Sequence, residues 1–339
     1  RVDRSQSSAD NWLVGYHPIN PAQLSYTRRQ FLSRSGMGFG ALGLAGLLDG
    51  AAKNPLLPKS PHYRPRAKRI IHLFMNGGPS HLDTFDPKPE LTKLHGQELP
   101  KMLKTERPTG AAFKSPFGFT RRGRCGLEVS DLFPQVGSMA DELCVIRSMH
   151  ADVPNHEPSL LLMNCGDGRL VRPAMGSWVT YGLGSENQNL PGFVAMCPGG
   201  YPIQETQNWQ SAFLPGAFQG TYVDTRHSDP KKLVEHIESG MGDSEQRRQL
   251  DLLRAMNEDH QRQRSHDARL EARLQSFELA YRMQMEASEA FDISKEPEEI
   301  RKMYGSGTQA RQMLITRRLV ERGVRFVQVW SGCDNGFPR

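Results

Sequence analysis

The 339-residue sequence has no closely spaced cysteine pair and no long apolar run, and both absences limit what the protein can be. Its five cysteines never occur as C-x-x-C, so a zinc knuckle or a thioredoxin motif is not expected. An oxidising compartment would allow one disulfide, but the sequence does not choose the pair. The uncharged segment 36–48 would span roughly 20 Å as a helix, at ~1.5 Å per residue. Because a bilayer core is about 30 Å thick, this segment is not a membrane span.

The sequence also lacks blocks of one charge and aromatic residues interleaved with basic ones. Its net charge is +6 and its pI about 9.1, but the basic residues are spread along the chain, and in 247–273 they alternate with acidic ones. A hydrophobic content of 37% with a mean hydropathy of −0.57 provides a core under a very polar surface. We therefore interpret the charge as a solvated surface and expect no nucleic-acid partner.

Arg28 and Arg29, followed by Gln-Phe-Leu and then by the Gly- and Ala-rich segment 36–48, resemble a twin-arginine export signal. The prediction is a protein exported in the folded state to the periplasm or the extracellular space, with no stable membrane span after export. Whether the signal is cleaved stays open, because Asp49 directly precedes the small residues Gly50, Ala51 and Ala52, which would otherwise suit a cleavage site. We divide the chain into the signal-bearing region 1–52, a Pro-rich linker 53–66 and an α/β domain 67–339.

Three polar clusters each follow an expected strand. The apolar run 70–75, expected to be a buried strand, ends at Asn76 and leads to Ser80, His81 and Asp83. A second cluster, 148–159, follows a short expected strand at 144–146, and a third follows the alternating strand 324–330 and contains Asp334. The carboxyl ends of parallel strands are where open α/β sheets bind ligands. We therefore expect the three loops to converge on one edge of the sheet.

The residue types in these clusters suit a divalent cation, because carboxylates, imidazoles and amides bind Ca, Mg or Zn. The candidate metal ligands are Asp83, His81, Asp334 and Asn76. The candidate catalytic groups are His156, Asn155 and Ser80. His156, at an expected helix N-terminus, is a nucleophile, a general base or a further ligand, while Asn155 and Ser80 orient substrate oxygens. Each residue also has a structural interpretation: Asx side chains close turns and cap helices, and a single histidine is usually a surface residue.

Helical periodicity marks several other segments. We expect helices over 131–143, 175–183 and 308–322, and a strand over 191–196. A further helix is expected to begin within the cluster 148–159 and to close near Gly166. The segment 243–291 is a long helical excursion: one long helix or a helical hairpin, with a coiled-coil arm as the alternative. Residues 87–130 show little periodicity and are expected to form long loops.

Five motifs together resemble one family. They are N-G-G-P-S-H-L-D-T-F-D-P-K-P from Asn76, N-H-E-P-S from Asn155, M-G-S-W-V-T-Y-G-L-G-S-E-N with L-P-G-F-V, A-F-D-I-S-K-E-P-E-E-I-R-K-M-Y-G, and R-R-L-V-E-R-G-V-R-F-V-Q-V. The resemblance is to the bacterial family called domain of unknown function 1501, abundant in planctomycetes, and it covers nearly all of 28–339. It implies a three-layer α/β/α sandwich like that of alkaline phosphatases and sulfatases, which are metal-dependent hydrolases. Because family members extend further, it also implies a C-terminally truncated member.

The chain departs from the superfamily pattern at decisive positions. His156 stands where sulfatases have a Cys or Ser nucleophile, Leu160 where they have Arg, and Asn76 where relatives place a metal-binding Asp. These departures exclude formylglycine chemistry at position 156. The leading hypothesis is an exported, metal-dependent hydrolase-like protein acting on a sulfate or phosphate ester of a small molecule or polysaccharide. The alternative is a non-catalytic exported binding or scaffold protein that retains the fold. The sequence identifies no protein partner.

Overall fold

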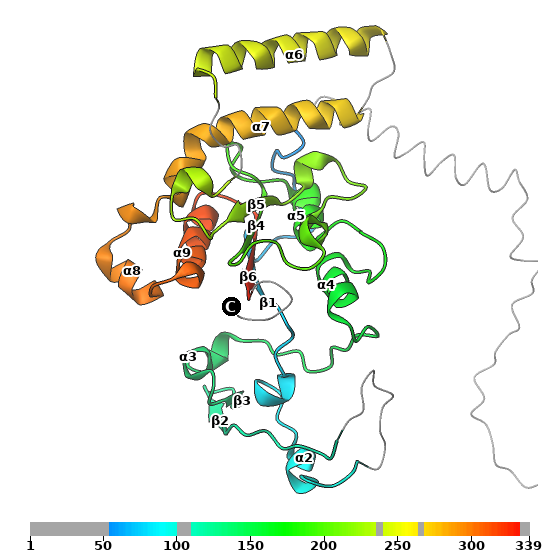
Figure 1. Cartoon of the computed structure of the whole chain (residues 1–339), viewed down its shortest axis with the longest axis vertical. Helices are drawn as coiled ribbons and strands as arrows, with labels where there is room; N and C mark the ends of the chain where they lie inside the picture. Colours follow the sequence, from blue (N-terminus) through cyan, green and yellow to red (C-terminus); the bar gives the residue numbers. More distant parts are fainter. Residues whose placement is uncertain (1–53, 100–109, 235–239, 264–267, 333–339) are drawn as a thin grey trace, which may run out of the picture. The chain divides into compact units, whose positions relative to one another are not determined.

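The computed structural model describes residues 54–99, 110–234, 240–263 and 268–332 (Figure 1). Its centre is a four-stranded parallel sheet in the order β1-β6-β4-β5. These strands are β1 (Ile70–Met75), β6 (Phe326–Ser331), β4 (Phe193–Cys197) and β5 (Thr221–Asp224). The protein is thus α/β, as predicted. The predicted signal lies outside the described residues, and no helix within the described ranges is long and apolar enough to cross a membrane.

Strand β1 is an edge strand, which corrects the expectation that it is buried. In the described part of the chain it pairs only with β6, and its apolar side chains Ile70, Ile71, Leu73 and Met75 are between 36% and 56% exposed. By contrast, the alternating strand β6 lies inside the sheet, and five of its six residues are buried. A short apolar run predicts a strand but does not say whether the strand is central or peripheral.

One face of the sheet packs on the helices α7 (Ala268–Phe291) and α9 (Thr308–Glu321). Val194 and Met196 of β4 and Val327 and Val329 of β6 point to this side, because alternate residues of a strand share a face. They meet Ile315 and Leu319 of α9 and Met283 and Ala287 of α7, all nearly inaccessible to solvent.

The opposite face packs on α4 (His156–Cys165), α5 (Met175–Leu183) and the 3₁₀ helix η4 (Glu205–Trp209). Here Ala195 and Cys197 of β4 and Trp330 of β6 meet Leu161 of α4 and Trp209. Gln328 of β6 lies in the same layer and donates to Asn164 of α4 at 2.6 Å, so a buried amide pair fixes the end of α4 on the sheet. Helices therefore cover both faces of a parallel sheet (Figure 1).

The expected helix 131–143 and the expected strand 144–146 were both wrong. The structure has only α3 (Pro134–Gly137) and the 3₁₀ turn η3 (Ala140–Glu142), followed by irregular chain through 144–146. The apolar positions that predicted a buried face are exposed: Leu132 by 48%, Val136 by 38%, Met139 by 55% and Leu143 by 38%. A short amphipathic pattern with no surface to pack on is not enough to hold a helix.

Residues 119–130, expected to be loop, form an antiparallel hairpin of β2 (Phe119–Arg122) and β3 (Leu127–Ser130). Gly123 and Gly126 have positive φ angles in its turn. The carboxylate of Asp141 accepts from the backbone N–H groups of Arg124 and Cys125, so a residue from a later turn fixes this connection.

The long helical segment is a hairpin, which confirms that interpretation over a single helix. α6 (Asp243–Gln263) packs on α7, and Arg247 and Arg254 both pair with Glu278. The remaining short helical elements are η2 (His81–Asp83), α2 (Pro89–Lys93), η5 (Gly216–Phe218), η6 (Pro230–Lys232), η7 (Ile293–Lys295) and α8 (Glu298–Tyr304). The cysteines within the described ranges form no disulfide with one another: Cys125, Cys144, Cys165 and Cys197.

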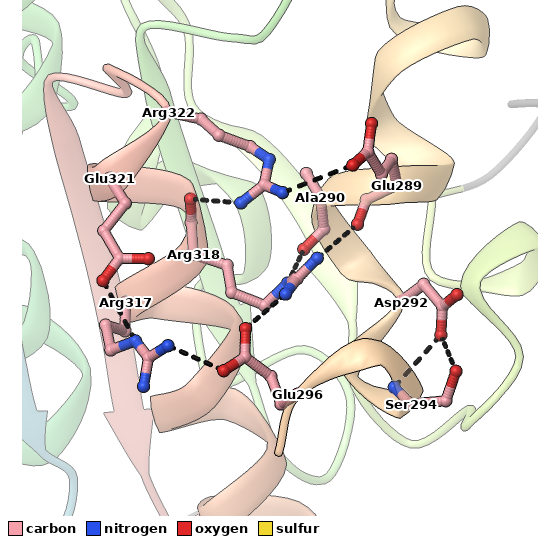
Figure 2. A network of polar contacts seen from close by, with 9 residues as sticks. All are labelled: Glu289, Ala290, Asp292, Ser294, Glu296, Arg317, Arg318, Glu321 and Arg322. Carbon is pink, nitrogen blue, oxygen red and sulfur yellow. Dashed lines mark hydrogen bonds and ion pairs between the residues drawn. The ribbon is translucent and has the colours of Figure 1, made fainter. Parts of the chain in front are cut away.

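A buried ionic network joins α9 to the segment that follows α7 (Figure 2). Arg318 donates to the carboxylate of Glu296 and to the backbone carbonyls of Ala290, at 3.0 Å, and Glu289, at 2.8 Å. Arg317 contacts the second oxygen of Glu296 at 2.7 Å. Arg318 and Glu296 are 5% and 8% exposed, and we refer to this pair as the Glu296–Arg318 clamp.

Candidate functional site

The four parallel strands deliver four loops to one edge of the sheet. The chain leaves β1 at Asn76 and β6 at Gly332, and the backbone N–H of Asn76 donates to the carbonyl of Ser331 at 2.9 Å. The first and third predicted clusters therefore begin side by side. Asp334, the candidate ligand of the third cluster, lies outside the described residues. The amide nitrogen of the Asn76 side chain is buried without a hydrogen-bond partner in the described part of the chain.

Ser80, His81 and Asp83 share one tight turn, because η2 begins directly after Gly77, Gly78 and Pro79. The side chains of Ser115 and, to a lesser degree, Ser80 hydrogen-bond the Asp83 carboxylate and lower its pKa below the ordinary value. Asp83 is therefore ionised at neutral pH. Its hydrogen-bond partners are hydroxyls, and the charge of His81 in the same turn makes a smaller contribution that also lowers the pKa. Ser80 and His81 are exposed, and Asp83 is half-buried.

Asp86, three residues later, has a different role. It is 6% exposed and pairs with Lys88 at 2.7 Å and with Arg147 at 3.8 Å. Its hydrogen bond with Lys88, helped by the charge of Arg147, lowers its pKa. Because Arg147 directly precedes the second cluster, Asp86 joins the loop after β1 to the start of that cluster. These contacts give Asp86 a structural role.

His156 and Asn155 lie at the amino end of α4, as expected, and both are exposed. Asn155 occupies the N-cap position, but its side chain makes no capping hydrogen bond. The Ser159 hydroxyl instead donates to the carbonyl of Val153 at 2.9 Å and ties the first turn to the preceding loop. The backbone N–H groups at this end are open to solvent or to an acceptor.

The described residues do not bring the predicted metal ligands together into a complete site. Nowhere in the described ranges do three His, Cys, Asp or Glu side chains gather closely enough to hold a metal ion. His81 and Asp83 share a turn and supply two donors, while His156 belongs to another element. Two donors do not complete the coordination of Ca, Mg or Zn, so the fit to a metal ion is partial.

A cavity of about 420 Å³ opens beside Asp83. Ser115, the hydroxyl partner of Asp83, is one of its walls, and Leu82 of η2 is another. That volume lies within the range of small-molecule sites, which are mostly apolar with a few polar groups. Its other walls combine apolar and basic residues: Pro87, Lys88, Pro89, Leu91, Thr92, Lys93, Phe117 and Phe119.

A polar group at the end of β5 was not predicted from the sequence. Burial opposes the ionisation of Asp224, but Arg226 reaches both its carboxylate oxygens, at 2.6 to 3.1 Å, and the net effect is a lowered pKa. Arg311 of α9 donates to the carbonyl of Thr225 and to the Ser228 hydroxyl. The sequence does contain a signal for this group, the polar run Asp224-Thr-Arg at the end of the strand. However, a strand of four residues is too short to be recognised by its periodicity.

Fold and site together define an α/β protein with polar loops at the carboxyl edge of a parallel sheet. Residues 67–336 match the family model described as "Protein of unknown function (DUF1501)". The chain belongs to this family, as its motifs predicted. A search of curated proteins and a search of solved structures each found no match.

Proposed function

We propose that this protein is an exported hydrolase of the alkaline phosphatase and sulfatase type, acting on a sulfate or phosphate ester of a small molecule or polysaccharide. The observation that carries the proposal is Asp83: an ionised carboxylate that accepts hydrogen bonds from the hydroxyls of Ser115 and Ser80, on the loop after a parallel strand and beside a cavity of about 420 Å³. The helices on both faces of the sheet support the three-layer α/β/α sandwich that this class has.

A divalent cation, Ca, Mg or Zn, is part of the proposal. Asp83 and His81 are its first two ligands, and Asn76 and Asp334 complete the candidate set. The unpartnered nitrogen of the Asn76 side chain is a hydrogen-bond donor, so it supports an acceptor such as an ester oxygen near the start of this loop and not the cation itself. The side-chain oxygen of Asn76 accepts from the backbone N–H of Gly77 at 3.0 Å. Because the described donors are too few for a full site, we assign no reaction step to the cation.

His156 is the proposed catalytic group, and Ser80 and Asn155 are proposed to orient the ester oxygens. The support for His156 is its exposed position at an uncapped helix N-terminus, where backbone N–H groups and the helix dipole favour an anionic ester. The imidazole is proposed to act as a general base towards water.

The test is hydrolysis by the purified full chain of aryl sulfates and aryl phosphates, each with Ca, Mg or Zn added. We expect turnover with at least one cation and its loss, by 10²-fold or more, in His156→Ala and Asp83→Ala. Glu90→Ala is the matched control, because Glu90 is an exposed carboxylate that pairs with Lys93 at 2.6 Å. Turnover that His156→Ala and Glu90→Ala change equally would exclude His156 as the catalytic group.

The second candidate is a non-catalytic exported binding or scaffold protein that keeps the same fold. The replacements that support it are His156 at the nucleophile position, Leu160 for Arg and Asn76 for a metal-binding Asp. It predicts no turnover of any ester in the panel, together with retained binding of a sulfated or phosphorylated saccharide, measured by calorimetry. Turnover abolished by Asp83→Ala would exclude it.

Export by the twin-arginine route is tested separately from activity. Replacing Arg28 and Arg29 together by Lys keeps the charge but removes the proposed signal. We expect the variant to remain in the cytoplasm and the unmodified chain to leave it, measured by cell fractionation. Equal export of the two proteins would contradict the proposal.

A further inference from the structure

Helix α6 exposes most of its apolar residues, although Leu250, on the side facing α7, is half-buried. Leu252 and Met256 are 61% and 62% exposed, whereas Asn257 is only 6% exposed and the side-chain oxygen of Gln246 is buried without a partner in the described part of the chain. A helix lying on a single neighbour normally buries its apolar stripe and exposes its polar one. The reversed arrangement indicates that the outward face of α6 has a partner of its own.

The contacts to α7 fix which face of α6 is outward. Arg247 and Arg254 pair with Glu278 of α7, and together with Leu250 and Asn257 they recur at three- and four-residue intervals along one stripe. At ~100° per residue, the stripe that contains Arg248, Leu252, Ala255 and Asp259 lies on the opposite side of the helix. All four of these residues are exposed.

This outward stripe is complementary to itself. The midpoint of the apolar region lies between Leu253 and Arg254. Arg248 lies five residues before Leu253 and Asp259 lies five residues after Arg254, so these two opposite charges are equally far from the midpoint. Leu252 and Ala255 are likewise related through that midpoint. Arg248 and Asp259 are roughly 16 Å apart along the helix axis, at ~1.5 Å per residue, which is too far for them to pair with each other.

We propose that the protein forms a two-fold dimer in which α6 of one copy packs antiparallel on α6 of a second copy. Arg248 of each copy then faces the second copy's Asp259, and Leu252 faces the second copy's Ala255. The small side chain of Ala255 lets the two helices approach closely, and Met256 flanks the contact. A two-fold axis requires a surface that matches itself, and the symmetric placement of opposite charges meets that requirement; an unrelated partner would not need it. The two α6/α7 hairpins together form a four-helix interface.

The first experiment measures the mass of the full chain by sedimentation equilibrium. We expect about twice 38.1 kDa for the unmodified protein and the monomer mass for Leu252→Lys with Met256→Lys. Glu299→Lys on α8 is the control, an exposed change of charge on a different helix, and is expected to leave the dimer intact. Circular dichroism checks that each variant keeps its helix content. A monomeric unmodified protein at 100 µM, or a dimer unaffected by the two lysines, would overturn the proposal.

The second experiment tests the symmetry. Arg248→Glu and Asp259→Arg each place like charges opposite one another at both ends of the interface. Each variant alone is expected to raise the dissociation constant about tenfold or more, because two favourable pairs become repulsive. Mixing the two variants pairs opposite charges again, so labelled copies are expected to form a mixed dimer of about the original affinity. Failure of the mixture to associate more tightly than either variant alone would contradict the antiparallel register.

Discussion

Two carboxylates of this protein, Glu296 and Asp83, are both held ionised, but by opposite means. Glu296 is buried against Arg318 and Arg317, so its charge is neutralised inside the structure (Figure 2). Asp83 is half-buried and receives hydrogen bonds from two serines, which lower its pKa more than the charge of nearby His81 does. The first arrangement holds elements together, and the second leaves a negative charge available to a ligand. A lowered carboxylate pKa therefore points to a functional site only when the groups that lower it are known.

The largest expected effect on stability comes from breaking the Glu296–Arg318 clamp. Arg318→Ala leaves the Glu296 carboxylate buried with only Arg317 as a cationic partner, and it also removes the donors to the carbonyls of Ala290 and Glu289. We expect the free energy of unfolding to fall by about 3 kcal/mol, the lower end of the cost of breaking a buried ion pair. Urea denaturation measures this. Lys302→Ala, which removes only an exposed ion pair with Glu298, is the control and is expected to cost less than about 1 kcal/mol.

The pH dependence of stability tests whether Glu296 is held ionised by its arginine partners. Burial opposes the ionisation of Glu296, but Arg318 and Arg317 lower its pKa below the ordinary value of 4.5. Its contribution is therefore fully present above about pH 4.5 and is lost as the pH falls through the lower pKa of the folded state. We expect Glu296→Gln to be less stable than the unmodified protein at pH 7, with a difference that shrinks below pH 4.5. A difference that grows on acidification would contradict the sign.

Asp83→Asn tests the other side of the comparison. The amide keeps an oxygen acceptor for the hydroxyls of Ser80 and Ser115 but removes the charge. We expect urea denaturation to show a change within about 0.5 kcal/mol, since the group is not part of the core. Cation binding, followed by calorimetry with Ca, Mg and Zn, is expected to be lost. Unchanged cation binding would show that Asp83 is not a ligand.

The smallest effect concerns the serine beside Asp83. Ser115→Ala removes the larger of the two hydroxyl contributions, so the pKa of Asp83 is expected to rise towards its ordinary value of 3.8. An NMR titration of the Asp83 carboxyl carbon measures the shift. Ser80→Ala is the matched comparison and is expected to raise the pKa by less. The reverse order would mean that Ser80 is the main partner.

The sequence predicted those elements whose pattern is long enough to carry a period. The helix expected over 175–183 is α5, the helix expected to close near Gly166 is α4, and the helix expected to end before Gly323 is α9. The four-residue strand β5 carried too little pattern to be predicted. The segment 131–143 does have an amphipathic pattern, but its apolar side has no surface to pack on in the described part of the chain. An amphipathic pattern shows which side chains a segment can bury, but the fold decides whether there is a surface against which to bury them.

The candidate site was predictable in its position and not in its partners. The loop after β1 was expected to carry Ser80, His81 and Asp83, and the structure places all three in one turn. Ser115 was missed because it lies 32 residues beyond Asp83 in a region without periodicity. The expected gathering with His156 does not occur as a cluster among the described residues. Two residues that are close in space but separated along the chain by irregular structure leave no pattern in a single sequence from which their contact could be predicted.

The Glu296–Arg318 clamp also restricts which substitutions the sequence can accept during evolution. Losing either partner strands a charge in the interior, whereas exchanging both for apolar side chains of similar volume costs little. Lysine in place of Arg318 would keep the charge but not the planar fork that reaches one carboxylate and two carbonyls at once. Positions 296 and 318 are therefore expected to vary as a linked pair across related sequences, present together or replaced together.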